Sequence, residues 1–470
     1  MAEENIRLLV LDILLEVEKK NIFVKDALHK VLSNRQFMSK QDRAFITRMV
    51  EGVTEYQVRL DYVIDCYSSK KVQKCKPLIR SVLRMGVYQI LYMDSVPDEA
   101  ACNECVRLTK KRGFQNLSGF VNGVLRSIVR NRDQITFPKW EDDFIAFLSV
   151  EYSMPVWIVQ HMADWYGVEK TKRMLEVSLE ATDLTIRVNT AKTDTESLIS
   201  KWKEKGIEVS EGYYVPEALH LKNINYPRRI PGFLQGEFFI QDESSMLLYH
   251  LADLEQEYSV TGNDVKEKGL SNIVEPLRVL DLCAAPGGKS THFAQMLGEK
   301  AVIEARDLSD KKLALILENV ERLGLNNIHA IKWDALVPDT EKEEWADVVI
   351  ADLPCSGFGI FSKKNDIKYH IKEQQLTELV NLQRTILANA ARYVKPGGLL
   401  LYSTCTINPA ENKENADWFL QHFPFMAVDI RGVVPGELKH SVLKENMLQL
   451  LPGDVKCDGF FIAKFKKQSD

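Results

Sequence analysis

Two cysteines lie in similar surroundings fifty residues apart in the chain. Cys355 follows the apolar run 347–350, and Cys405 follows the apolar run 399–402. Side chains just beyond the carboxyl ends of parallel strands face the ligand crevice of an open α/β sheet, so we expect both thiols to face one bound molecule. Because a deprotonated thiol is a good nucleophile, each cysteine is a candidate for covalent catalysis.

A third loop is expected at the same edge of the sheet. The strand-like run 278–283 leads into a turn that contains Gly287 and Gly288, and a helix is predicted to follow. Glycines let the backbone approach a ligand closely, and Asp307, just past the next predicted strand, can accept hydrogen bonds from ribose hydroxyls. The loop therefore suggests a nucleoside-bearing cofactor, with a plain tight turn as the alternative. Its spacing matches neither GxGxxG nor the Walker pattern, which disfavours a nucleotide triphosphatase.

The composition is that of a soluble enzyme. A chain of 470 residues, 45% of them hydrophobic, can bury large cores and is too long for one ordinary domain. It has no apolar run near the roughly 20 residues of a membrane span, and residues 1–7 do not resemble a signal peptide. Eight cysteines in such a chain are better explained as cytosolic thiols than as disulfides. We therefore expect a cytoplasmic protein with no membrane partner.

The charge is unevenly distributed along the chain. The net charge is −5, but residues 1–140 hold 24 Lys and Arg against 16 Asp and Glu, and residues 107–132 include seven basic residues and no acidic one. Phosphates respond to a local patch because salt screens charges beyond roughly 10 Å. RNA contacts are therefore expected there, with a solvated helical face as the alternative. The candidate RNA-binding residues are Arg107, Lys110, Lys111, Arg112, Arg126 and Arg130.

Three structural regions are predicted from the periodicity of apolar residues. Residues 1–138 are expected to be all helical, because apolar residues recur at spacings of three and four without the period of two that strands require. Residues 139–235 are predicted to form a small α+β linking module. Residues 236–470 alternate strand and helix, which predicts a mostly parallel sheet covered by helices on both faces.

Individual elements can be predicted within the last two regions. In the linking module, strands are expected near 184–190, 207–209 and 219–221, with a helix at 193–205. In the third region, the expected strands are 279–282, 301–305, 329–332, 346–351, 398–402 and the closing 459–465, and the expected helices are 290–297, 310–323, 376–394 and 411–422. The polar stretch 261–268 is expected to be a flexible surface loop.

Several motifs resemble those of one enzyme family. Those at residues 281–289, 352–357, 404–412 and 458–461 resemble the Sun (Fmu) family of RNA cytosine-5 methyltransferases. Residues 41–45, 79–91 and 120–126 resemble the helical RNA-binding domain of the NusB antitermination factor. A NusB-like domain fused to this core is the arrangement of the family's bacterial enzyme for small-subunit ribosomal RNA. The resemblance implies an α/β class I methyltransferase domain with a Rossmann-like, mostly parallel seven-stranded sheet.

The resemblance also implies a reaction. The expected enzyme transfers a methyl group from S-adenosylmethionine to C5 of a cytosine in 16S ribosomal RNA. Addition of a thiolate at C6 makes C5 nucleophilic, so a covalent adduct divides a difficult reaction into easier steps. By resemblance, Cys405 attacks C6 and Cys355 assists release of the product. DNA cytosine methyltransferases attack from a Pro-Cys motif instead, so the residues alone leave the opposite assignment open.

Further residues are expected in the site. Asp352 is expected at the cytosine edge, either as a protonated donor to N3 or as a carboxylate that holds loop amides. Lys289 is expected to contact the same site or to balance the charge of Asp352, and Asp334 resembles the family's contact with the adenine of the cofactor. The expected catalytic residues are Cys405, Cys355, Asp352 and Lys289. The expected cofactor-binding residues are Cys283, Ala284, Ala285, Pro286, Gly287, Gly288, Lys289, Asp307, Asp334 and Asp352.

Other interpretations remain open from the sequence. Cys102 and Cys105 lack the second ligand pair of a structural zinc site, so they are expected to be ordinary helix residues and no metal is expected. Glu411, which follows Pro409, either begins a helix by bonding to free amides or takes part in catalysis. The substrate is expected to be unassembled or partly assembled 16S RNA, bound by a monomer. The alternatives are transfer or large-subunit RNA, and an inactive methylase core that serves as a scaffold.

Overall fold

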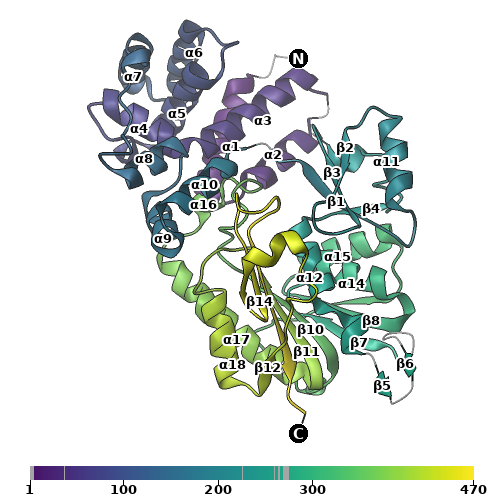
Figure 1. Cartoon of the computed structure of the whole chain (residues 1–470). Helices are drawn as coiled ribbons and strands as arrows, with labels where there is room; N and C mark the ends of the chain where they lie inside the picture. Colours follow the sequence, from purple (N-terminus) through teal and green to yellow (C-terminus); the bar gives the residue numbers. More distant parts are fainter. Residues whose placement is uncertain are drawn as a thin grey trace. The chain divides into compact units, whose positions relative to one another are not determined.

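The computed structural model describes residues 5–35, 37–180, 182–224, 226–258, 260–262, 265–267 and 275–469. The chain folds into two compact units (Figure 1). The helical unit consists of Met1–Leu179 and Phe361–Glu373, and the α/β unit consists of Glu180–Ile360 and Gln374–Asp470. No helix in the described ranges is both long enough and apolar enough to cross a bilayer.

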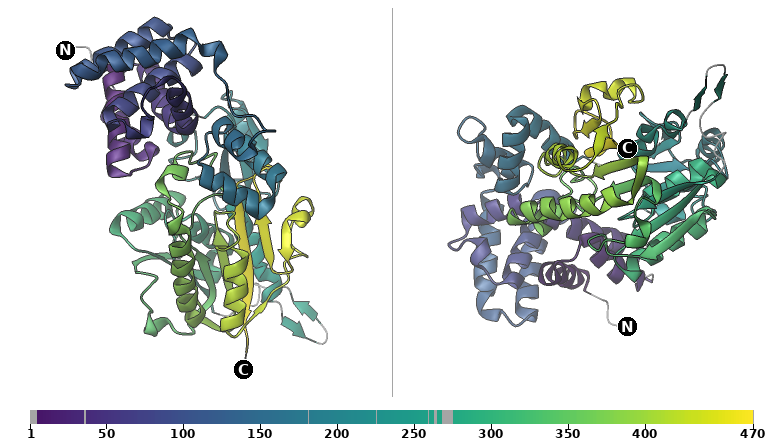
Figure 2. Two further views of the ribbon diagram at one scale, coloured as in Figure 1. Left: turned by 90° about the vertical axis from the view of Figure 1, so that its left-hand side faces the viewer. Right: turned by 90° about the horizontal axis from the view of Figure 1, so that it is seen from below.

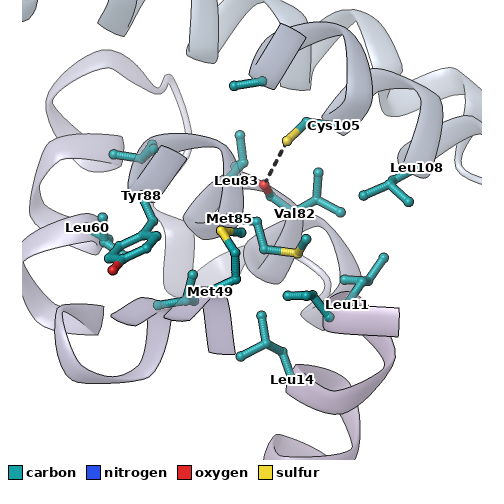
Figure 3. Close-up of a cluster of buried hydrophobic side chains, with 14 of the residues drawn as sticks. Leu11, Leu14, Met49, Leu60, Val82, Leu83, Met85, Tyr88, Cys105 and Leu108 are labelled. Carbon is teal, nitrogen blue, oxygen red and sulfur yellow. Dashed lines mark hydrogen bonds between the residues drawn. The ribbon is translucent and has the colours of Figure 1, made fainter. Parts of the chain in front are cut away.

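The helical unit is built from amphipathic helices around one apolar core (Figure 3). Its helices are α1 (Ile6–Lys20), α2 (Val24–Ser33), α3 (Lys40–Glu55), α4 (Gln57–Tyr67), α5 (Pro77–Tyr92), α6 (Asp98–Lys111), α7 (Ser118–Arg130), α8 (Phe144–Glu151), α9 (Val156–Tyr166), α10 (Val168–Ser178) and α16 (Ile367–His370). Cys102 and Cys105 are buried on α6, and the Cys105 thiol donates to the carbonyl of Val82 at 3.5 Å. Burial raises the pKa of Cys105 to about 12. Both thiols are therefore ordinary core residues, as expected.

A segment from late in the chain, Phe361–Glu373, packs into this helical unit. The carboxylate of Asp366 accepts a hydrogen bond from the backbone amide of Val24 at 2.7 Å, and the buried ammonium of Lys368 donates to the carbonyl of Glu55 at 3.1 Å. A cavity of about 210 Å³ lies among α1, α3, α5 and this segment. The chain therefore leaves the α/β unit after Ile360 and returns to it at Gln374.

The compact units do not follow the three predicted regions. Residues 139–179, predicted to open the linking module, belong to the helical unit. Ser153, just after α8, accepts a hydrogen bond from the backbone amide of Val58 at 3.0 Å, and Glu151 pairs with Arg59 at 2.8 Å. These contacts with α4 explain why the first helices of that region group with the N-terminal ones. The predicted limits at 138 and 235 remain predictions.

The α/β unit begins with a small antiparallel sheet of order β2-β3-β1-β4. Its elements are β1 (Leu184–Val188), α11 (Thr195–Lys203), β2 (Val209–Glu211), β3 (Ala218–Leu221) and β4 (Phe238–Ile240). The alternation of side chains in β1 places Ile186 and Val188 in the core with Trp202 of α11. The small α+β module predicted here is therefore present.

The larger sheet has nine strands in the described part of the chain, not the seven that were predicted. Its parallel part has the order β11-β10-β7-β8-β9, and β15 adds antiparallel to β11. The elements are β7 (Leu277–Asp281), α14 (Gly288–Leu297), β8 (Ala301–Asp307), α15 (Asp310–Leu323), β9 (Ile328–Lys332), β10 (Ala346–Asp352), α17 (Gln374–Tyr393), β11 (Val394–Thr404), α18 (Lys413–His422), β12 (Phe425–Ala427), β13 (Val442–Lys444), β14 (Met447–Leu450) and β15 (Phe460–Lys467). The unpredicted strands β12, β13 and β14 are too short to show a strand period.

Helices cover both faces of this sheet (Figure 1). Val279, Val348 and Leu401 pack in one core with α14 and with α12 (Glu243–Ala252), which is followed by the short α13 (Leu254–Glu257). The next residue along each strand points to the opposite core, which contains side chains of α17 and α18. Strands buried on both faces are typical of a parallel sheet in a doubly wound α/β fold.

The stretch predicted as a loop at 261–268 contains strands. β5 (Val260–Gly262) and β6 (Val265–Glu267) pair in an antiparallel hairpin. In both views of Figure 2 this hairpin projects from the body of the α/β unit. The loop prediction is therefore wrong for these strands, while its residues 263, 264 and 268 lie outside the described ranges. A polar run gives no apolar signal by which such a hairpin could be recognised.

Candidate active site

The two thiols singled out in the sequence meet at the edge of the sheet. Cys355 and Cys405 follow β10 and β11, which are neighbouring parallel strands with Asp352 paired opposite Ser403. The sulfur atoms are joined by a hydrogen bond of 3.3 Å. The predicted convergence of the two thiols is therefore observed, and it follows from adjacent strands that end at the same level.

The environment of Cys355 favours its protonated form. The hydrogen bond with Cys405 is the largest cause that raises the pKa of the Cys355 thiol well above its usual range. Burial acts in the same direction, as do the nearby carboxylates of Glu411 and Asp352. The pKa of Cys355 is therefore raised by its contact with Cys405 and by its burial, and either sulfur can be the donor of the hydrogen bond between them.

Asp352 and Lys289 form an ion pair at the end of β10. The ammonium Nζ of Lys289 lies 2.6 Å from Oδ2 of Asp352, and the Ser403 hydroxyl donates to Oδ1 at 2.8 Å. Among the described residues, the hydrogen-bond partners of Asp352 are the side chains of Lys289 and Ser403. Its carboxylate is not seen to hold loop amides there, which was one of the two roles expected. The expected compensation of its charge by Lys289 is observed.

The glycine turn links β7 to α14, as the sequence predicted. Gly287 has a φ of +99°, which favours glycine, and a side chain added there would meet nothing closer than 3.6 Å. Arg187 of β1, fully buried, holds this turn by donating to the carbonyl of Gly288 at 2.8 Å and to the hydroxyl of Thr291 at 3.0 Å. The sequence showed no function for Arg187, because its partners lie about a hundred residues away.

The other expected cofactor residues lie around this turn and at the ends of β8 and β9. Oδ2 of Asp307 accepts from the amide of Ala285 at 3.0 Å, whereas Oδ1 of Asp334 accepts from the amide of Leu336 at 3.0 Å. Leu308 and Val337, which lie near these carboxylates in sequence, expose 59% and 51% of their area. Cys283 is partly exposed, Ala284 is buried and Pro286 is exposed. The Asp307 carboxylate is buried and also pairs with Lys312 at 2.8 Å, whereas Asp334 is half-buried. This edge therefore combines two carboxylates with uncovered apolar side chains.

Glu411 has a different role from the one its sequence position suggested. The helix expected from residue 411 starts only at Lys413, and its N-cap residue Asn412 makes no side-chain cap bond. The buried Glu411 carboxylate instead accepts from the backbone amide of Ser356 at 2.9 Å and from the side chain of Gln383 at 2.8 Å. The helix-start interpretation is therefore wrong in detail, since this carboxylate binds the loop that carries Cys355.

The candidate RNA-binding residues are all exposed on the helical unit. Some of their charge is balanced locally, because Arg107 lies 3.2 Å from Glu104 and Arg112 pairs with Asp12. Lys110 and Lys111 close the last turn of α6 and have no ion-pair partner within the described ranges. Arg126 and Arg130 bond only to neutral oxygens, of Asn122 and Arg126, among the described residues. The uncompensated charge of the patch therefore comes from these two lysines and these two arginines.

Glu217, His250 and His292 bring three possible metal ligands within 4.8 Å of one another. Both imidazole Nε2 atoms lie 2.8 Å from the same carboxylate oxygen of Glu217. Burial and the positive charge of Arg187 lower the pKa of His292 to about 3, so this ring is neutral and can donate to Glu217. Hydrogen bonds account for the three side chains, which tie the turn before β3 to α12 and α14.

Comparisons with known proteins agree with this architecture. Residues 270–466 match the family described as "16S rRNA methyltransferase RsmB/F", residues 4–130 match the NusB family, and residues 154–225 match the RsmF/B-like ferredoxin-like domain. Crystal structures with a similar fold include PH0851, at 24% identity and a TM-score of 0.79 over 99% of both chains. Another is NSun6 from Pyrococcus horikoshii with SFG, at 20% identity and 0.55, covering 67% of this chain and 99% of that one.

Full-length relatives carry one name. The chain is 35% identical to the probable ribosomal RNA small subunit methyltransferase B of Bacillus subtilis (strain 168), over 100% of both chains. It is 30% identical to the protein of the same name from Synechocystis, over 97% of this chain and 98% of the relative. The expected fold, with a NusB-like helical domain, a small module and a Rossmann-like methyltransferase domain, is thereby confirmed. The chain belongs to the RsmB/F family of 16S rRNA methyltransferases.

Proposed function

We propose that this protein transfers a methyl group from S-adenosylmethionine to C5 of a cytosine in 16S ribosomal RNA, through a covalent cysteine adduct at C6. The observation that carries this proposal is the contact between the Cys355 and Cys405 sulfurs at 3.3 Å. Two thiols at one point of the crevice supply a nucleophile and a second group that can handle a proton. A scaffold would need neither.

S-adenosylmethionine fits the residues at the carboxyl edge of the sheet. When bound, it supplies a methyl group carried on a positively charged sulfur. The turn 284–289 allows close backbone approach, and Asp307 and Asp334 offer carboxylates to the ribose and the adenine edge. The exposed apolar surfaces of Leu308 and Val337 suit the faces of a base.

Cys405 is the proposed nucleophile. The family resemblance assigns attack to Cys405, and the 3.3 Å contact lets a protonated Cys355 donate to the Cys405 thiolate. Its thiolate adds to C6 of the cytosine, and C5 becomes the nucleophile that takes the methyl group. This assignment agrees with the family resemblance and opposes the alternative in which Cys355 attacks.

Cys355 is the proposed group for product release. Once the Cys405 sulfur is bonded to C6 it no longer carries a charge, so the main cause of the raised pKa of Cys355 is removed. Cys355 can then release its proton to solvent, and the resulting thiolate can take the C5 proton. The electron pair of the C5–H bond forms the C5–C6 double bond as the bond between C6 and the Cys405 sulfur breaks, which frees the methylated base and leaves Cys405 as a thiolate. Cys355 therefore has to change between thiol and thiolate during the cycle.

Asp352 and Lys289 are proposed to bind the polar edge of the cytosine. Their ion pair leaves Asp352 with acceptor oxygens that suit the exocyclic amino group, while Lys289 supplies a positive charge against the electrons that move into the ring on thiolate addition. In this role Asp352 accepts a hydrogen bond from the cytosine, in place of the donation to N3 considered from the sequence, and Lys289 lies 2.6 Å from its Oδ2.

The RNA substrate must present an unstacked cytosine. Extrusion of a base from a stacked helix costs on the order of a few kcal/mol, which phosphate contacts made elsewhere can offset. We assign such contacts to six exposed basic residues of the helical unit, namely Arg107, Lys110, Lys111, Arg112, Arg126 and Arg130. The proposed substrate is unassembled or partly assembled 16S RNA, bound by a monomer in the cytoplasm.

Serine substitutions of the two cysteines test the proposed roles. With protein-free 16S RNA and S-adenosylmethionine, Cys405→Ser is expected to form no adduct and to transfer no methyl group. Cys355→Ser is expected to accumulate an RNA–protein adduct that survives a denaturing gel. The opposite pattern would exchange the roles of the thiols. Absence of an adduct in wild type and both variants, with methylation intact, would refute the covalent mechanism.

A further inference from the structure

The loop that carries Cys355 is held from both sides by hydrogen bonds. The side-chain amide of Gln383, on α17, donates to the carbonyl of Pro354 at 2.9 Å. The backbone amide of Ser356 donates to the Glu411 carboxylate at 2.9 Å, and Gln383 donates to the same carboxylate at 2.8 Å. The residue after Cys355 is therefore bonded directly to the buried Glu411, and the residue before Cys355 is linked to Glu411 through Gln383.

The loop that carries Cys405 is held in a similar way by the next residue, Asn412. Oδ1 of Asn412 accepts from the hydroxyl of Thr404 at 2.6 Å, and Nδ2 donates to the carbonyl of Thr406 at 2.9 Å. The same Nδ2 donates to Oε1 of Gln449 at 2.7 Å, which fixes the amide orientation. Asn412 is fully buried, so each of these bonds is protected from water.

We propose that Glu411 and Asn412 are positioning residues that together set the separation of the two thiols, Glu411 by holding the Cys355 loop and Asn412 by holding the Cys405 loop. Because the two residues are adjacent in the chain, the separation of the loops is fixed over a single peptide unit. The Ser356 and Thr406 hydroxyls, 2.6 Å apart, add a direct bond between the loops. The catalytic consequences rest on the proposed function.

Other contacts keep the loops folded when either residue is changed. The amide of Gly359 donates to the carbonyl of Cys405 at 3.1 Å, and the amide of Leu353 donates to the carbonyl of Ser403 at 3.0 Å. A side chain at Gly359 would come within 2.0 Å of the carbonyl of Gly459, so this approach requires glycine. Substitution of Glu411 or Asn412 is therefore expected to move the thiols without unfolding the site.

Glu411→Gln and Asn412→Asp are the sharpest changes because they preserve size. Glu411→Gln replaces one acceptor oxygen by an amide NH2 group, which cannot accept the hydrogen bonds that reach this carboxylate. The second replaces the donating amino group by an oxygen that faces the carbonyl of Thr406. Glu414→Gln is the matched control, since Glu414 is exposed in the first turn of α18. Thermal unfolding and S-adenosylmethionine binding of each variant establish that the α/β unit is intact.

The first measurement uses the rate of disulfide formation, in the absence of RNA, to report how close the Cys355 and Cys405 sulfurs lie. Diamide oxidises two adjacent thiols, so that two S–H bonds break, one S–S bond forms, and the azo group takes up two electrons and two protons. Peptide mapping then follows the disulfide between Cys355 and Cys405. Loss of a hydrogen bond to a buried polar group is expected to slow this cross-link about tenfold in Glu411→Gln and in Asn412→Asp. Cross-linking of both variants at the rate of wild type and Glu414→Gln would overturn the proposal.

The second measurement separates the two residues by the step they affect. With protein-free 16S RNA, Glu411→Gln is expected to accumulate the covalent adduct, because release depends on Cys355. Asn412→Asp is expected to form less adduct, because attack depends on Cys405. An identical decrease in both would contradict the division of roles. If cross-linking slows in the two variants but Cys355→Ser traps no adduct, the positioning role stands and the covalent mechanism fails. If cross-linking is unchanged but Cys355→Ser traps the adduct, only the positioning role is refuted.

Discussion

Asp281 is a buried carboxyl at the end of β7, beside the glycine turn. Its Oδ2 accepts from the hydroxyl of Ser290 at 2.6 Å, while Oδ1 has no hydrogen-bond partner among the described residues. Burial raises the pKa of Asp281 from 3.8 to about 7. Between these two pH values the folded protein keeps a proton that the unfolded chain has lost, so stability falls as pH rises through this window.

The substitution Asp281→Asn removes this titration. Because wild type loses stability as pH rises from about 4 to 7, the difference in unfolding free energy between Asp281→Asn and wild type is expected to grow in favour of the variant over this range. Above pH 7 the difference is expected to stay constant. The shift of the pKa from 3.8 to about 7 sets an upper limit on the order of 4 kcal/mol. Urea unfolding at pH 5, 6, 7 and 8 measures the difference, with exposed Glu378→Gln as control. Parallel pH profiles for wild type and Asp281→Asn would contradict the raised pKa.

The residues proposed to act on the substrate could be placed at one edge of the sheet from the sequence, but those that hold them could not. Cys355, Cys405 and Asp352 follow recognisable strands, and strand ends in a parallel sheet meet at one edge. Glu411 reaches Ser356 across 55 residues and Gln383 across 28, and no periodicity relates these positions. The sequence therefore identifies groups at element ends better than it identifies buried partners brought together by tertiary packing.

At the scale of elements, α2 depends on a residue from a distant part of the chain. Phe23, its N-cap residue, offers no side-chain hydrogen bond, and the amide of Val24 is bonded instead by the carboxylate of Asp366. A carboxylate at a helix N-terminus satisfies a free amide and interacts favourably with the helix dipole. The segment Phe361–Glu373 therefore stabilises the helical unit as well as connecting two parts of the α/β unit.

Asp366→Ala is expected to destabilise the helical unit by about 1–2 kcal/mol, the usual cost of losing a helix cap. Hydrogen exchange of the Val24 amide should become faster, while exchange in the strands of the α/β unit stays unchanged. Glu141→Ala, at an exposed site of the same unit, is the control. Unchanged protection of the first turn of α2 would show that Asp366 does not cap this helix.

Long elements with strong periodicity were predictable, and those defined by distant contacts were not. α15 has the predicted bounds 310–323, because its apolar positions and its N-terminal serine are local signals. The place of Phe361–Glu373 in the helical unit depends on contacts such as Asp366 with Val24, 342 residues apart. Local patterns carry no information on such a contact.

At the scale of the whole molecule, the basic charge lies in the part that resembles NusB. Residues 1–140 carry an excess of basic residues although the entire chain is acidic. Lys110 and Lys111 lie on the exposed end of α6 without ion-pair partners in the described part of the chain. Electrostatic attraction to phosphates depends on such uncompensated charges, so these lysines should contribute more to RNA binding than the paired Arg112.

The double variant Lys110→Glu/Lys111→Glu is therefore expected to bind 16S RNA more weakly while binding S-adenosylmethionine as wild type does. If each lysine contacts one phosphate, the plot of log affinity against log salt concentration should become less steep by about 1.4 for single-stranded RNA and about 1.8 for paired RNA. Lys203→Glu/Lys205→Glu, at the exposed end of α11, introduces the same charge change outside the patch. Filter binding at several salt concentrations measures both pairs. An equal loss of RNA affinity in the two double variants would mean that binding depends only on net charge. An unchanged RNA affinity of Lys110→Glu/Lys111→Glu would show that α6 is not part of the RNA interface.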